Sequence, residues 1–488
     1  MSQTPLRCQD LVIGSGPGGA VTAALLAEGG RDVLILEEGR CLPLESCEAF
    51  SMEEVLQKYR SGGLNPALGR PKIALVEGCC AGGGSEINSA LYHRTPEEIL
   101  EFWRDRYAVR DFGPAEMEPH FRYCEDALSV CLTPGRTPIA SRKLLEGADS
   151  LGWRAIEAPR CFRYDGGIGQ DGSPLGTRQS MTKTFLPRAL SAGARLIAET
   201  RALLLDRQHG KWNVTLLRRG GAPQGVPPGP IIAIADSVFV CGGAVETPAL
   251  LRRSGITRNI GNTLALHPTV KMVARFPEEV NHTHLGVPVH QVREFAPHMS
   301  LGCSISSLPY LMLGTADYPE RRNLLRSQWR HLAIYYAMIA GPSTGTVRNA
   351  GPGGHPDALV RYRLSPADWR HFSLGLRRLA RLLFAAGATE LYPTVSALPP
   401  LRTEDDLSRI PAELPADRTS LMSVHLFSSC PMGENRALCA TDSFGRVHGV
   451  PDLFIHDASL LCTAPGVNPQ GSIVALARRN TLHYLESR

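Results

Sequence analysis

The sequence predicts an α/β fold with two domains. One is built on a parallel sheet, and the other is a discontinuous α+β domain built on an antiparallel sheet. At 488 residues, the chain exceeds what one hydrophobic core usually holds. Apolar runs at residues 11–13, 33–36 and 231–240 are typical of buried parallel strands, and the first and last of them lead into glycine-containing turns. Between residues 270 and 421, short apolar segments alternate with Gly/Pro turns, which indicates an antiparallel sheet with helices on one side.

Residues 11–37 read as a strand, a glycine-rich loop, a helix and a second strand. The loop carries Gly14, Gly16 and Gly19 in G-x-G-x-x-G spacing. The first glycine permits a tight turn, the second lets a pyrophosphate approach the backbone, and the third lets the helix pack on the strand. The pyrophosphate would lie on a helix N-terminus, which favours negative charge. This pattern predicts a Rossmann-like dinucleotide site.

Glu37 stands at the carboxyl end of the second strand, where a carboxylate can accept the hydroxyls of a ribose. An acid rather than an arginine argues against a 2′-phosphate, so NAD or FAD is expected rather than NADP. Position alone does not separate NAD from FAD. Glycine-rich chains also produce this spacing by chance, but here the strand, the helix and the acid are all in place.

The elements that follow are predicted from periodicity and turn residues. Gly82, Gly83 and Gly84 form a backbone that a flat group can approach, with Asn88 at the start of a helix. Residues 96–131 read as helical, with Trp103, Tyr107 and Phe121 in the core. The other predicted elements are a helix at 52–59, a short helix within 180–194, strands within 196–217 around a turn at 208–210, a Gly/Pro loop at 220–230, a strand at 231–240 returning to the parallel sheet, and a helix at 246–253.

The second half of the chain contains the second domain and then returns to the first. Strands are expected at 332–339 and 358–362, turns at 341–342 and 351–354, and an amphipathic helix at 366–384. A last strand at 453–457 and a terminal helix at 472–485 complete the fold. We therefore divide the chain into a first nucleotide-binding part (1–100), a lid or substrate-domain excursion (101–180), a second nucleotide-binding part (181–269), a substrate domain (270–421) and a last nucleotide-binding part with the active site (422–488).

Composition excludes several functional classes. The net charge is +5, from 52 Lys+Arg and 47 Asp+Glu, and no basic stripe is interleaved with aromatic residues, so nucleic acid is not an expected partner. Arg370, Arg377, Arg378 and Arg381 read as a solvated helix face. Thirteen cysteines without a C-x-x-C pair predict reduced thiols, no disulfide framework and no metal site. No signal peptide and no apolar run of about eighteen residues is found, so we expect a cytoplasmic protein without a membrane span.

Four segments resemble one family, the glucose–methanol–choline (GMC) oxidoreductases. The first is the loop at 14–19 with Glu37, and the second is GGGSEIN at 82–88 with Arg94. The third is GGAVETPALLRRSGI at 242–256, followed by His267-Pro268. The fourth combines HLFSSCPM at 425–432 with VNPQGS at 467–472. The segments span the chain in the family's order, so the resemblance is global.

The resemblance implies an FAD-binding Rossmann-like domain and oxidation of a small-molecule alcohol. It implies His425 and Asn468 as the catalytic residues. Ile87 stands where some members attach FAD covalently through a histidine, so noncovalent FAD is expected. Ser428-Ser429 replaces the Gly-Thr of many members and is expected to leave the fold intact. The implied cofactor-binding residues are Gly14, Ser15, Gly16, Pro17, Gly18, Gly19, Glu37, Glu38, Gly83, Gly84, Ser85, Asn88, Ser89, Ala90, Thr200, Arg201, Gly242, Asp457, Ala458, Asn468, Pro469 and Gln470.

Alcohol oxidation removes a hydride from carbon and a proton from oxygen. A histidine, with an ordinary pKa of about 6.5, suits the proton acceptor. We assign this role to His425 and expect Asn468 to orient the substrate oxygen. Simpler interpretations exist: His425 as a core histidine, Asn468 before Pro469 as an N-cap of the last helix, and Asp457 as the cap of a turn. Directed at the pyrimidine edge of the flavin, that helix N-terminus would also stabilise negative charge on the reduced ring.

Two other functions remain as alternatives. A hydroxynitrile-lyase-like member of the family would keep the FAD and use the same histidine. An NAD(P)H-linked reductase would need a second strand–GxGxxG–helix unit, and residues 241–243 lack the third glycine. Residues 295–299 and 309–312 either line an apolar channel, which would suit a medium or large apolar primary alcohol, or belong to the core. The electron acceptor, O₂ or another carrier, is not readable from the sequence.

Overall fold

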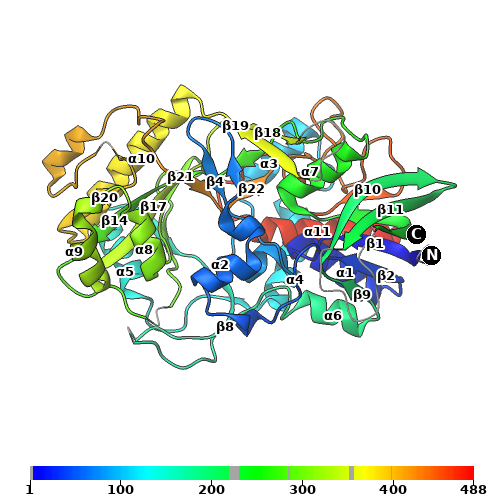
Figure 1. Ribbon diagram of the computed structural model, residues 1–488, viewed down its shortest axis with the longest axis horizontal. Coiled ribbons are helices and arrows are strands. Elements are labelled where there is room, and N and C mark those ends of the chain that lie inside the picture. The colour runs from blue at the N-terminus through cyan, green and yellow to red at the C-terminus, as the bar shows by residue number, and fades with distance from the viewer. Residues whose placement is uncertain (1–3, 171, 219–229, 284–285, 351–356, 397) are drawn as a thin grey trace.

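A computed structural model describes residues 4–170, 172–218, 230–283, 286–350, 357–396 and 398–488. Two lobes lie side by side, one around the parallel sheet and one around the antiparallel sheet (Figure 1). The predicted loop at 220–230, apart from its last residue, and the turn at 351–354 lie outside the described residues.

The parallel sheet of the first lobe confirms the predicted fold class. Its order is β10-β11-β12-β1-β2-β9, with β23 also paired to β12. β1, β2, β9 and β23 run parallel to their neighbours, and β12 returns beside β1 as predicted, with Val12 opposite Phe239. The bounds are β1 Leu6–Ile13, β2 Val33–Leu36, β9 Arg195–Ile197, β10 Thr200–Gln208, β11 Lys211–Arg218, β12 Pro230–Val240 and β23 Leu453–Ile455.

One edge of β12 is shared by two partners. Its first half pairs antiparallel with β11, and its last three residues pair parallel with β23. The carboxyl ends of β1 and β12 therefore lie next to the segment that follows β23, although more than half of the chain separates β1 from β23.

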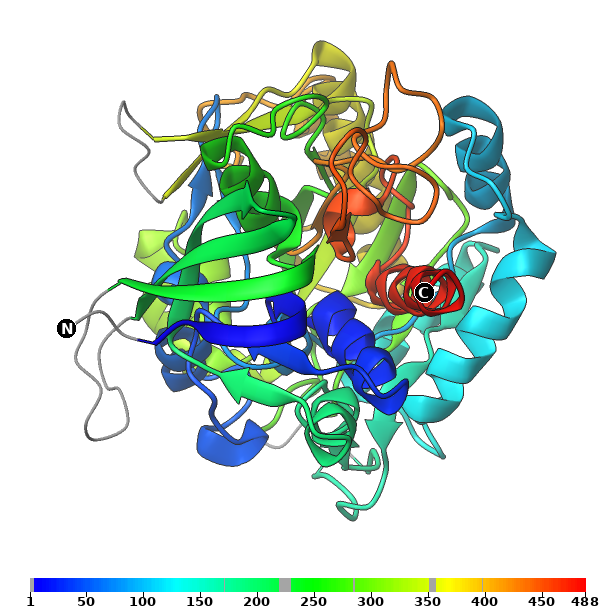
Figure 2. The same ribbon diagram turned by 90° about the vertical axis from the view of Figure 1, so that its right-hand side faces the viewer.

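Helices cover this sheet. Figure 2 shows α1 (Pro17–Glu28) beside α11 (Gln470–Glu486), which joins the two ends of the sequence. α1 is buried almost all round, because alanines and other small residues let it pack between the sheet and α11. The remaining helices of this lobe are α3 Glu97–Tyr107, α4 Pro114–Ala127, α6 Phe185–Ser191 and α7 Gly243–Arg253.

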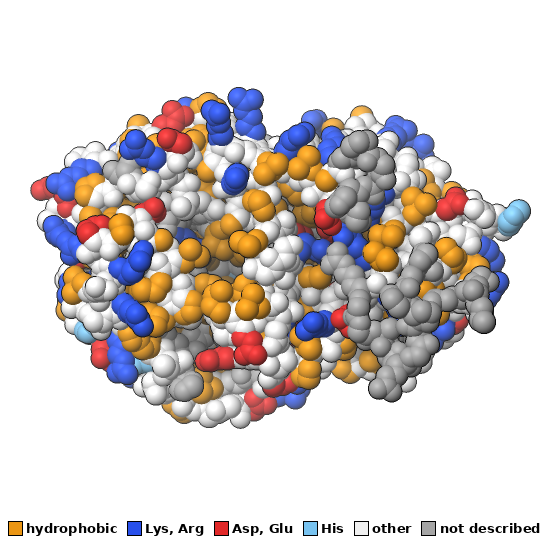
Figure 3. Space-filling model, in the orientation of Figure 1, with side chains coloured by type: hydrophobic (Ala, Val, Ile, Leu, Met, Phe, Trp, Pro, Cys, Tyr) orange, Lys and Arg blue, Asp and Glu red, His pale blue; other side chains and the backbone are white. Residues whose placement is uncertain are grey.

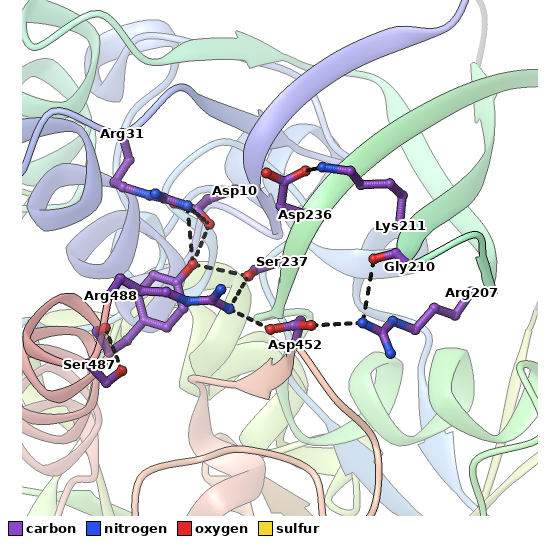
Figure 4. Close-up of polar contacts among 11 residues, drawn as sticks. Asp10, Arg31, Arg207, Gly210, Lys211, Asp236, Ser237, Asp452, Ser487 and Arg488 are labelled. Carbon is purple, nitrogen blue, oxygen red and sulfur yellow. Dashed lines mark hydrogen bonds and ion pairs between the residues drawn. The ribbon is translucent and has the colours of Figure 1, made fainter.

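A polar network ties α11 to the amino-terminal edge of the sheet (Figure 4). The Tyr484 hydroxyl donates to Asp10 Oδ1 at 2.7 Å and lies 3.0 Å from Ser237 Oγ, whose hydroxyl can donate to it. Arg31 Nε donates to Asp10 Oδ2 at 2.6 Å, which pairs the fully buried carboxylate of Asp10 with a cation. Asp452, just before β23, bridges Arg207 and Arg488. The network therefore links β1, β10, β12 and the last helix.

The second lobe contains a mostly antiparallel sheet in the order β3-β4-β21-β14-β17-β16-β15-β6, with β20 also paired to β14. α5 (Ile139–Ser150) and α10 (Pro366–Ala385) pack on one face. α8 (Leu308–Gly314) and α9 (Arg322–Ser327) cover part of the other face, so helices lie on both sides rather than one. The bounds are β3 Pro66–Ala67, β4 Ile73–Leu75, β6 Ala155–Glu157, β14 Thr269–Arg275, β15 His290–Val292, β16 Met299–Cys303, β17 Leu332–Ile339, β20 Glu390–Pro393 and β21 Leu421–Ser423.

Three local expectations differ from the structure. Asn88 does not begin a helix; a short 3₁₀ turn over Gly83–Glu86 precedes it. The predicted helical stretch 96–131 is two helices, α3 and α4, separated by residues 108–113, and it ends in a short strand at Val130–Cys131. β3 and β4 join the antiparallel sheet although they fall in the first nucleotide-binding part. The other elements are α2 Met52–Lys58, β5 Val130–Cys131, β7 Arg160–Arg163, β8 Thr177–Arg178, β13 Ala265–Leu266, β18 Gly345–Asn349, β19 Ala358–Tyr362 and β22 Leu426–Phe427.

In the part of the chain that the structure describes, no helix combines the length and the apolar character needed to cross a bilayer.

Candidate active site

The glycine loop at 14–19 closes against two other loops. Gly14 has φ +103°, a conformation that favours glycine, and a Cβ there would lie 2.3 Å from the carbonyl oxygen of Cys241. A Cβ on Gly18 would lie 1.7 Å from the carbonyl oxygen of His456. At Gly16, by contrast, a Cβ would make only one ordinary contact, with Gly83 Cα at 3.9 Å. The glycines therefore serve different purposes: Gly14 and Gly18 allow the loop to pack, and Gly16 leaves its outer side open.

Glu37 lies directly beneath this loop and is buried. Its Oε2 accepts from the Ser15 amide at 3.1 Å and the Ser15 hydroxyl at 2.6 Å, and its Oε1 accepts from the Gly39 amide at 2.8 Å. Burial raises the pKa of the Glu37 carboxyl, and these donors act in the opposite direction. Since each carboxylate oxygen can accept more than one hydrogen bond, Glu37 both shapes the loop and retains capacity for a ribose.

Glu38 and Arg201 belong to a buried charge cluster beside Glu37. Arg201 contacts Glu38 at 3.6 Å and Glu246 at 2.9 Å, and Arg60 contacts Glu38 at 3.1 Å. The Thr200 amide donates to the Glu37 carbonyl at 2.8 Å, so the start of β10 lies against the end of β2.

The second glycine loop meets the first. The Gly82 amide donates to Ser15 Oγ at 3.1 Å, and a Cβ on Gly83 would lie 2.9 Å from Gly16 Cα. Ser85 Oγ accepts from the Met181 amide at 3.0 Å. Ser85 therefore holds the loop in place, with Gly84 beside it.

Asn88 joins this loop to the beginning of the last helix. Its Nδ2 donates to Gln470 Oε1, and its Oδ1 accepts from the Ala90 amide at 2.9 Å. Ala90 has φ +58°, and the Ser89 carbonyl accepts from Arg160 Nε at 3.3 Å. The side chain of Asn88 thus organises a turn, which explains why no helix begins there.

Asp457 has the capping role that was one of its two interpretations. Its Oδ2 accepts from the Gly243 amide at 2.8 Å, next to Gly242 at the start of α7, and from Thr247 Oγ1. Its Oδ1 accepts from the Ser459 amide at 2.8 Å, beside Ala458. Burial raises the pKa of the Asp457 carboxyl, and these donors act against the shift. Asp457 therefore fixes α7 and the turn after β23 on the same edge of the sheet.

His425 and Asn468 are brought together from segments more than forty residues apart. Asn468 Nδ2 lies 3.2 Å from His425 Nε2. α11 begins at Gln470 with Pro469 as its cap residue and no side-chain cap bond, so Asn468 does not cap this helix. His425 keeps part of its surface exposed, and burial of the rest lowers its pKa to about 4. His425 is thus neutral at neutral pH and able to accept a proton.

His267, which had no derivable role in the sequence, is the second partner of His425. The two Nδ1 atoms are 3.1 Å apart, and the Gly466 amide donates to His267 Nε2 at 3.2 Å. Burial, together with His425 and Arg293, lowers the pKa of His267 well below its ordinary value. Since the amide can only donate, it favours the proton of neutral His267 on Nδ1, whereas Asn468 Nδ2 favours a free Nε2 on His425. Both contacts therefore favour the Nδ1–H tautomer, but two Nδ1–H groups cannot bond each other across 3.1 Å, so the two preferences compete.

Gln291, also missed from the sequence, sets the orientation of Asn468. Its Nε2 donates to Asn468 Oδ1 at 3.1 Å and to the Tyr336 hydroxyl at 3.4 Å. Its neighbour Arg293 donates through Nη1 to the Gly466 carbonyl at 2.8 Å. No local sequence signal marks these residues, because β15 reaches the catalytic pair only through the fold of the second lobe.

His93 is a buried histidine whose ring lacks hydrogen-bond partners within the described part of the chain. Both of its ring nitrogens are buried and have no hydrogen-bond partner among the described residues. Burial, then Arg293 and His425, lowers its pKa to about 3. A neutral imidazole has one hydrogen-bond donor and one acceptor. Burying both without hydrogen bonds costs free energy unless a bound molecule forms those bonds. The open side of Gly16 and this histidine therefore fit a cofactor that runs from the glycine loops to His425.

Among the described residues, no group of three His, Cys, Asp or Glu side chains is arranged to hold a metal ion. Ser428 has φ +63°, a region that favours glycine, which gives a physical reason for the glycine found here in many members of the family that the sequence resembles. His448 and His456 contact the Gly433 carbonyl and Thr22 Oγ1 respectively, away from the catalytic pair.

Comparison with known proteins identifies the family of this chain. The GMC oxidoreductase family models match residues 55–269 and 342–477, and an NAD(P)-binding Rossmann-like model matches residues 12–42. An uncharacterized GMC-type oxidoreductase of Sinorhizobium fredii is 39% identical over 98% of this chain and 94% of its own length. The chain belongs to the GMC oxidoreductase family. It is accordingly an FAD-dependent oxidoreductase that acts on alcohol-type donors.

Two further comparisons extend the resemblance of this GMC chain to other proteins. A long-chain-alcohol oxidase of Arabidopsis thaliana is 27% identical, and the alignment covers 97% of this chain and 66% of the oxidase. The crystal structure of pyridoxine 4-oxidase from Mesorbium loti superposes with a TM-score of 0.75 at 18% identity, over 98% of this chain and 99% of the other. The similarity to pyridoxine 4-oxidase shows a shared fold.

Proposed function

We propose that this GMC oxidoreductase oxidises an alcohol to a carbonyl with His425 as general base and Asn468 as the group that orients the substrate oxygen. The observation that carries the proposal is the 3.2 Å contact between His425 Nε2 and Asn468 Nδ2 beside the start of α11. A substrate oxygen placed beside this pair can contact both side chains. Removal of a hydroxyl proton requires a base and an orienting group at hydrogen-bond distance from the same oxygen.

Bound FAD supplies the acceptor for the hydride. The residues proposed to hold it are the glycines of both loops, Glu37 near the ribose, and the segment from Asn468 to Gln470. Ile87 is buried and has no nucleophilic atom, which supports noncovalent binding. The free amides at the start of α11 favour negative charge on whatever lies before them.

The protein's own part of the reaction is to hold the oxygen and take the proton. In the active tautomer, His425 carries its own proton on Nδ1, and its Nε2 lone pair receives the hydroxyl proton. Asn468 favours this state because Gln291 engages its Oδ1 and directs its Nδ2 toward His425. The imidazole is neutral before the reaction, since burial holds its pKa near 4.

Anaerobic reduction of the bound flavin tests this function. The purified holoprotein is mixed with aliphatic, aromatic and sugar alcohols, and the flavin absorbance is recorded. Bleaching by one class is expected, with strong slowing in His425→Ala and partial slowing in Asn468→Ala. Release of hydrogen peroxide in air would identify O₂ as the acceptor. A bound flavin that no alcohol bleaches, together with cyanide release from hydroxynitriles, would instead identify a lyase.

A further inference from the structure

The face of the antiparallel sheet that meets the catalytic pair carries a row of four residues. Lys271 on β14 is opposite Tyr336 on β17, Tyr336 is opposite Gly302 on β16, and Gly302 is opposite Gln291 on β15. Residues directly opposite each other project to the same side of a sheet. Since Gln291 donates to Asn468, this row begins at the active site and runs away from it across the sheet.

The other face of the same strands is filled by α5 and α10. Met272, Tyr335, Leu301 and Val292 point into that core. Next to the row, Val273 and Ile334 are covered by Leu311 of α8. The row itself is not covered in this way, because Lys271 and Tyr336 both keep part of their surface accessible while most of their strand neighbours are buried.

Tyr336 leans toward Gln291 and away from Lys271. A Cβ on Gly302 would lie 2.3 Å from Tyr336 Cζ, so the ring lies over Gly302 and brings its hydroxyl within 3.4 Å of Gln291 Nε2. The glycine therefore allows the tyrosine to cross one strand.

Lys271 is a cation without a counter-ion. Among the residues that the structure describes, no carboxylate pairs with its Nζ and no acceptor receives a hydrogen bond from it. Lys58 shows the ordinary alternative, because its Nζ donates to the carbonyl of Leu44 at 2.9 Å. Burial lowers the pKa of Lys271 to about 8, so it is mostly protonated at neutral pH. Lys271 Nζ is not among the fully buried polar atoms that lack a partner, so it remains open to a ligand that supplies an acceptor.

We propose that Lys271 binds an oxyanion, a carboxylate or a phosphate, at the end of the substrate opposite to the reacting hydroxyl. This assignment rests on the proposed function, which places the hydroxyl between His425 and Asn468. The row spans three strand spacings, so Lys271 lies roughly 14 Å from Gln291. The substrate is then an elongated molecule with an alcohol at one end and an anion at the other. Tyr336 and the apolar side chains near α8 contact its middle.

The surface near this row is apolar, as expected for a substrate whose middle part is apolar. Figure 3 shows hydrophobic side chains gathered over α2 and α8 on the face that is in view. The exposed members of these helices and their neighbour loop include Leu56, Leu64 and Leu313, which are 73%, 83% and 74% exposed. The hydroxyls of Tyr59 after α2 and Tyr310 on α8 are close enough to interact electrostatically, which joins the two sides of this apolar area.

The test compares ω-hydroxy fatty acids with primary alcohols of equal chain length as reductants of the bound flavin. Wild-type protein is expected to prefer the hydroxy acid at one range of chain lengths. Lys271→Met keeps the length of the side chain but removes its charge, and should reduce this preference by about ten- to a hundredfold without slowing the neutral alcohol. Lys271→Arg should restore the preference. Lys211→Met is the control, because Lys211 pairs with Asp236 on the surface of the other lobe (Figure 4).

A binding measurement keeps this inference separate from the proposed function. Saturated fatty acids and alkyl phosphates without a hydroxyl group should raise the melting temperature of wild-type holoprotein and not that of Lys271→Met, and the larger rise identifies the preferred anion. Equal melting shifts in both proteins, or a hydroxy-acid preference that survives Lys271→Met, would overturn the anion site. Failure of every alcohol to bleach the flavin would overturn the proposed function, while the melting shifts would still decide the role of Lys271.

Discussion

Reduction of the bound flavin is expected to stay fast at pH values well below the ordinary pKa of histidine. Burial lowers the pKa of His425 from 6.5 to about 4. This difference corresponds to roughly 3 kcal/mol of additional cost for charging the imidazole. The neutral form is the one that accepts the proton, so the rate constant is at its plateau above about pH 5 and falls as the pH decreases through about 4. Bound cofactor and substrate exclude further water and shift this limb in the same direction.

The assay is anaerobic stopped-flow reduction at saturating alcohol, from about pH 4 to about pH 9, a range wide enough to resolve both forms of the base. His425→Asn is the matched control, since it keeps a hydrogen-bonding side chain but cannot take the proton. It should be slow throughout and lack the acidic limb. An acidic limb centred at or above pH 6.5 in wild-type protein would refute the burial argument. Fast reduction by His425→Asn would remove His425 from the role of base.

The remaining predictions concern the supports of the site. Replacing Gln291 by Leu frees Asn468 to rotate and should slow flavin reduction by about tenfold, as expected for one lost hydrogen bond, while the melting temperature changes little; an unchanged rate would show that Asn468 does not need this partner. Gly16→Ala should fold normally but bind FAD more weakly, because its Cβ meets only an ordinary contact in the protein and points to the open side of the loop. Gly18→Ala should lower the stability by more than about 3 kcal/mol, because its Cβ would overlap a backbone carbonyl, and calorimetry with FAD titration separates the two variants. Acid precipitation should release all the flavin into the supernatant, because Ile87 cannot form a covalent bond; yellow colour retained in the pellet would contradict this.

The parts of the fold that depend on residues close in sequence were predicted best. The G-x-G-x-x-G loop, β1, α1 and β2 form within thirty-odd neighbouring residues. Gly14 and Gly19 have the steric reasons that the motif implies, since a Cβ there would lie 2.3 Å and 2.0 Å from a backbone carbonyl oxygen, whereas Gly16 has an open outer side. The return of β12 to the same sheet was also predicted, because an apolar run leading into glycine is a strong strand signal. Asn88 was misplaced because its side chain bonds Ala90 and Gln470 and competes with a helix.

The candidate site was predicted only where motifs mark it. His425 and Asn468 lie in segments that resemble the family, and the structure places them in contact. Gln291 and Lys271 carry no such mark, because their positions depend on the register between four strands that are distant in sequence. The contact of His267 with His425 likewise depends on antiparallel pairing of β13 and β22. Pairing of this kind is decided by tertiary packing and cannot be derived from local periodicity.

The divided edge of β12 has a consequence for how the protein is made. β23 completes the sheet at the very place where Asp457 fixes the start of α7, and α11 covers α1 only after that. A ribosome completes β12 more than two hundred residues before it reaches β23, so the nascent chain holds a sheet with an unpaired strand edge over that interval. Closure is a late, long-range step, which makes folding slow and exposes the edge to other chains. FAD should therefore bind after release from the ribosome, and an added supply of flavin during expression would protect the completed sheet rather than assist its assembly.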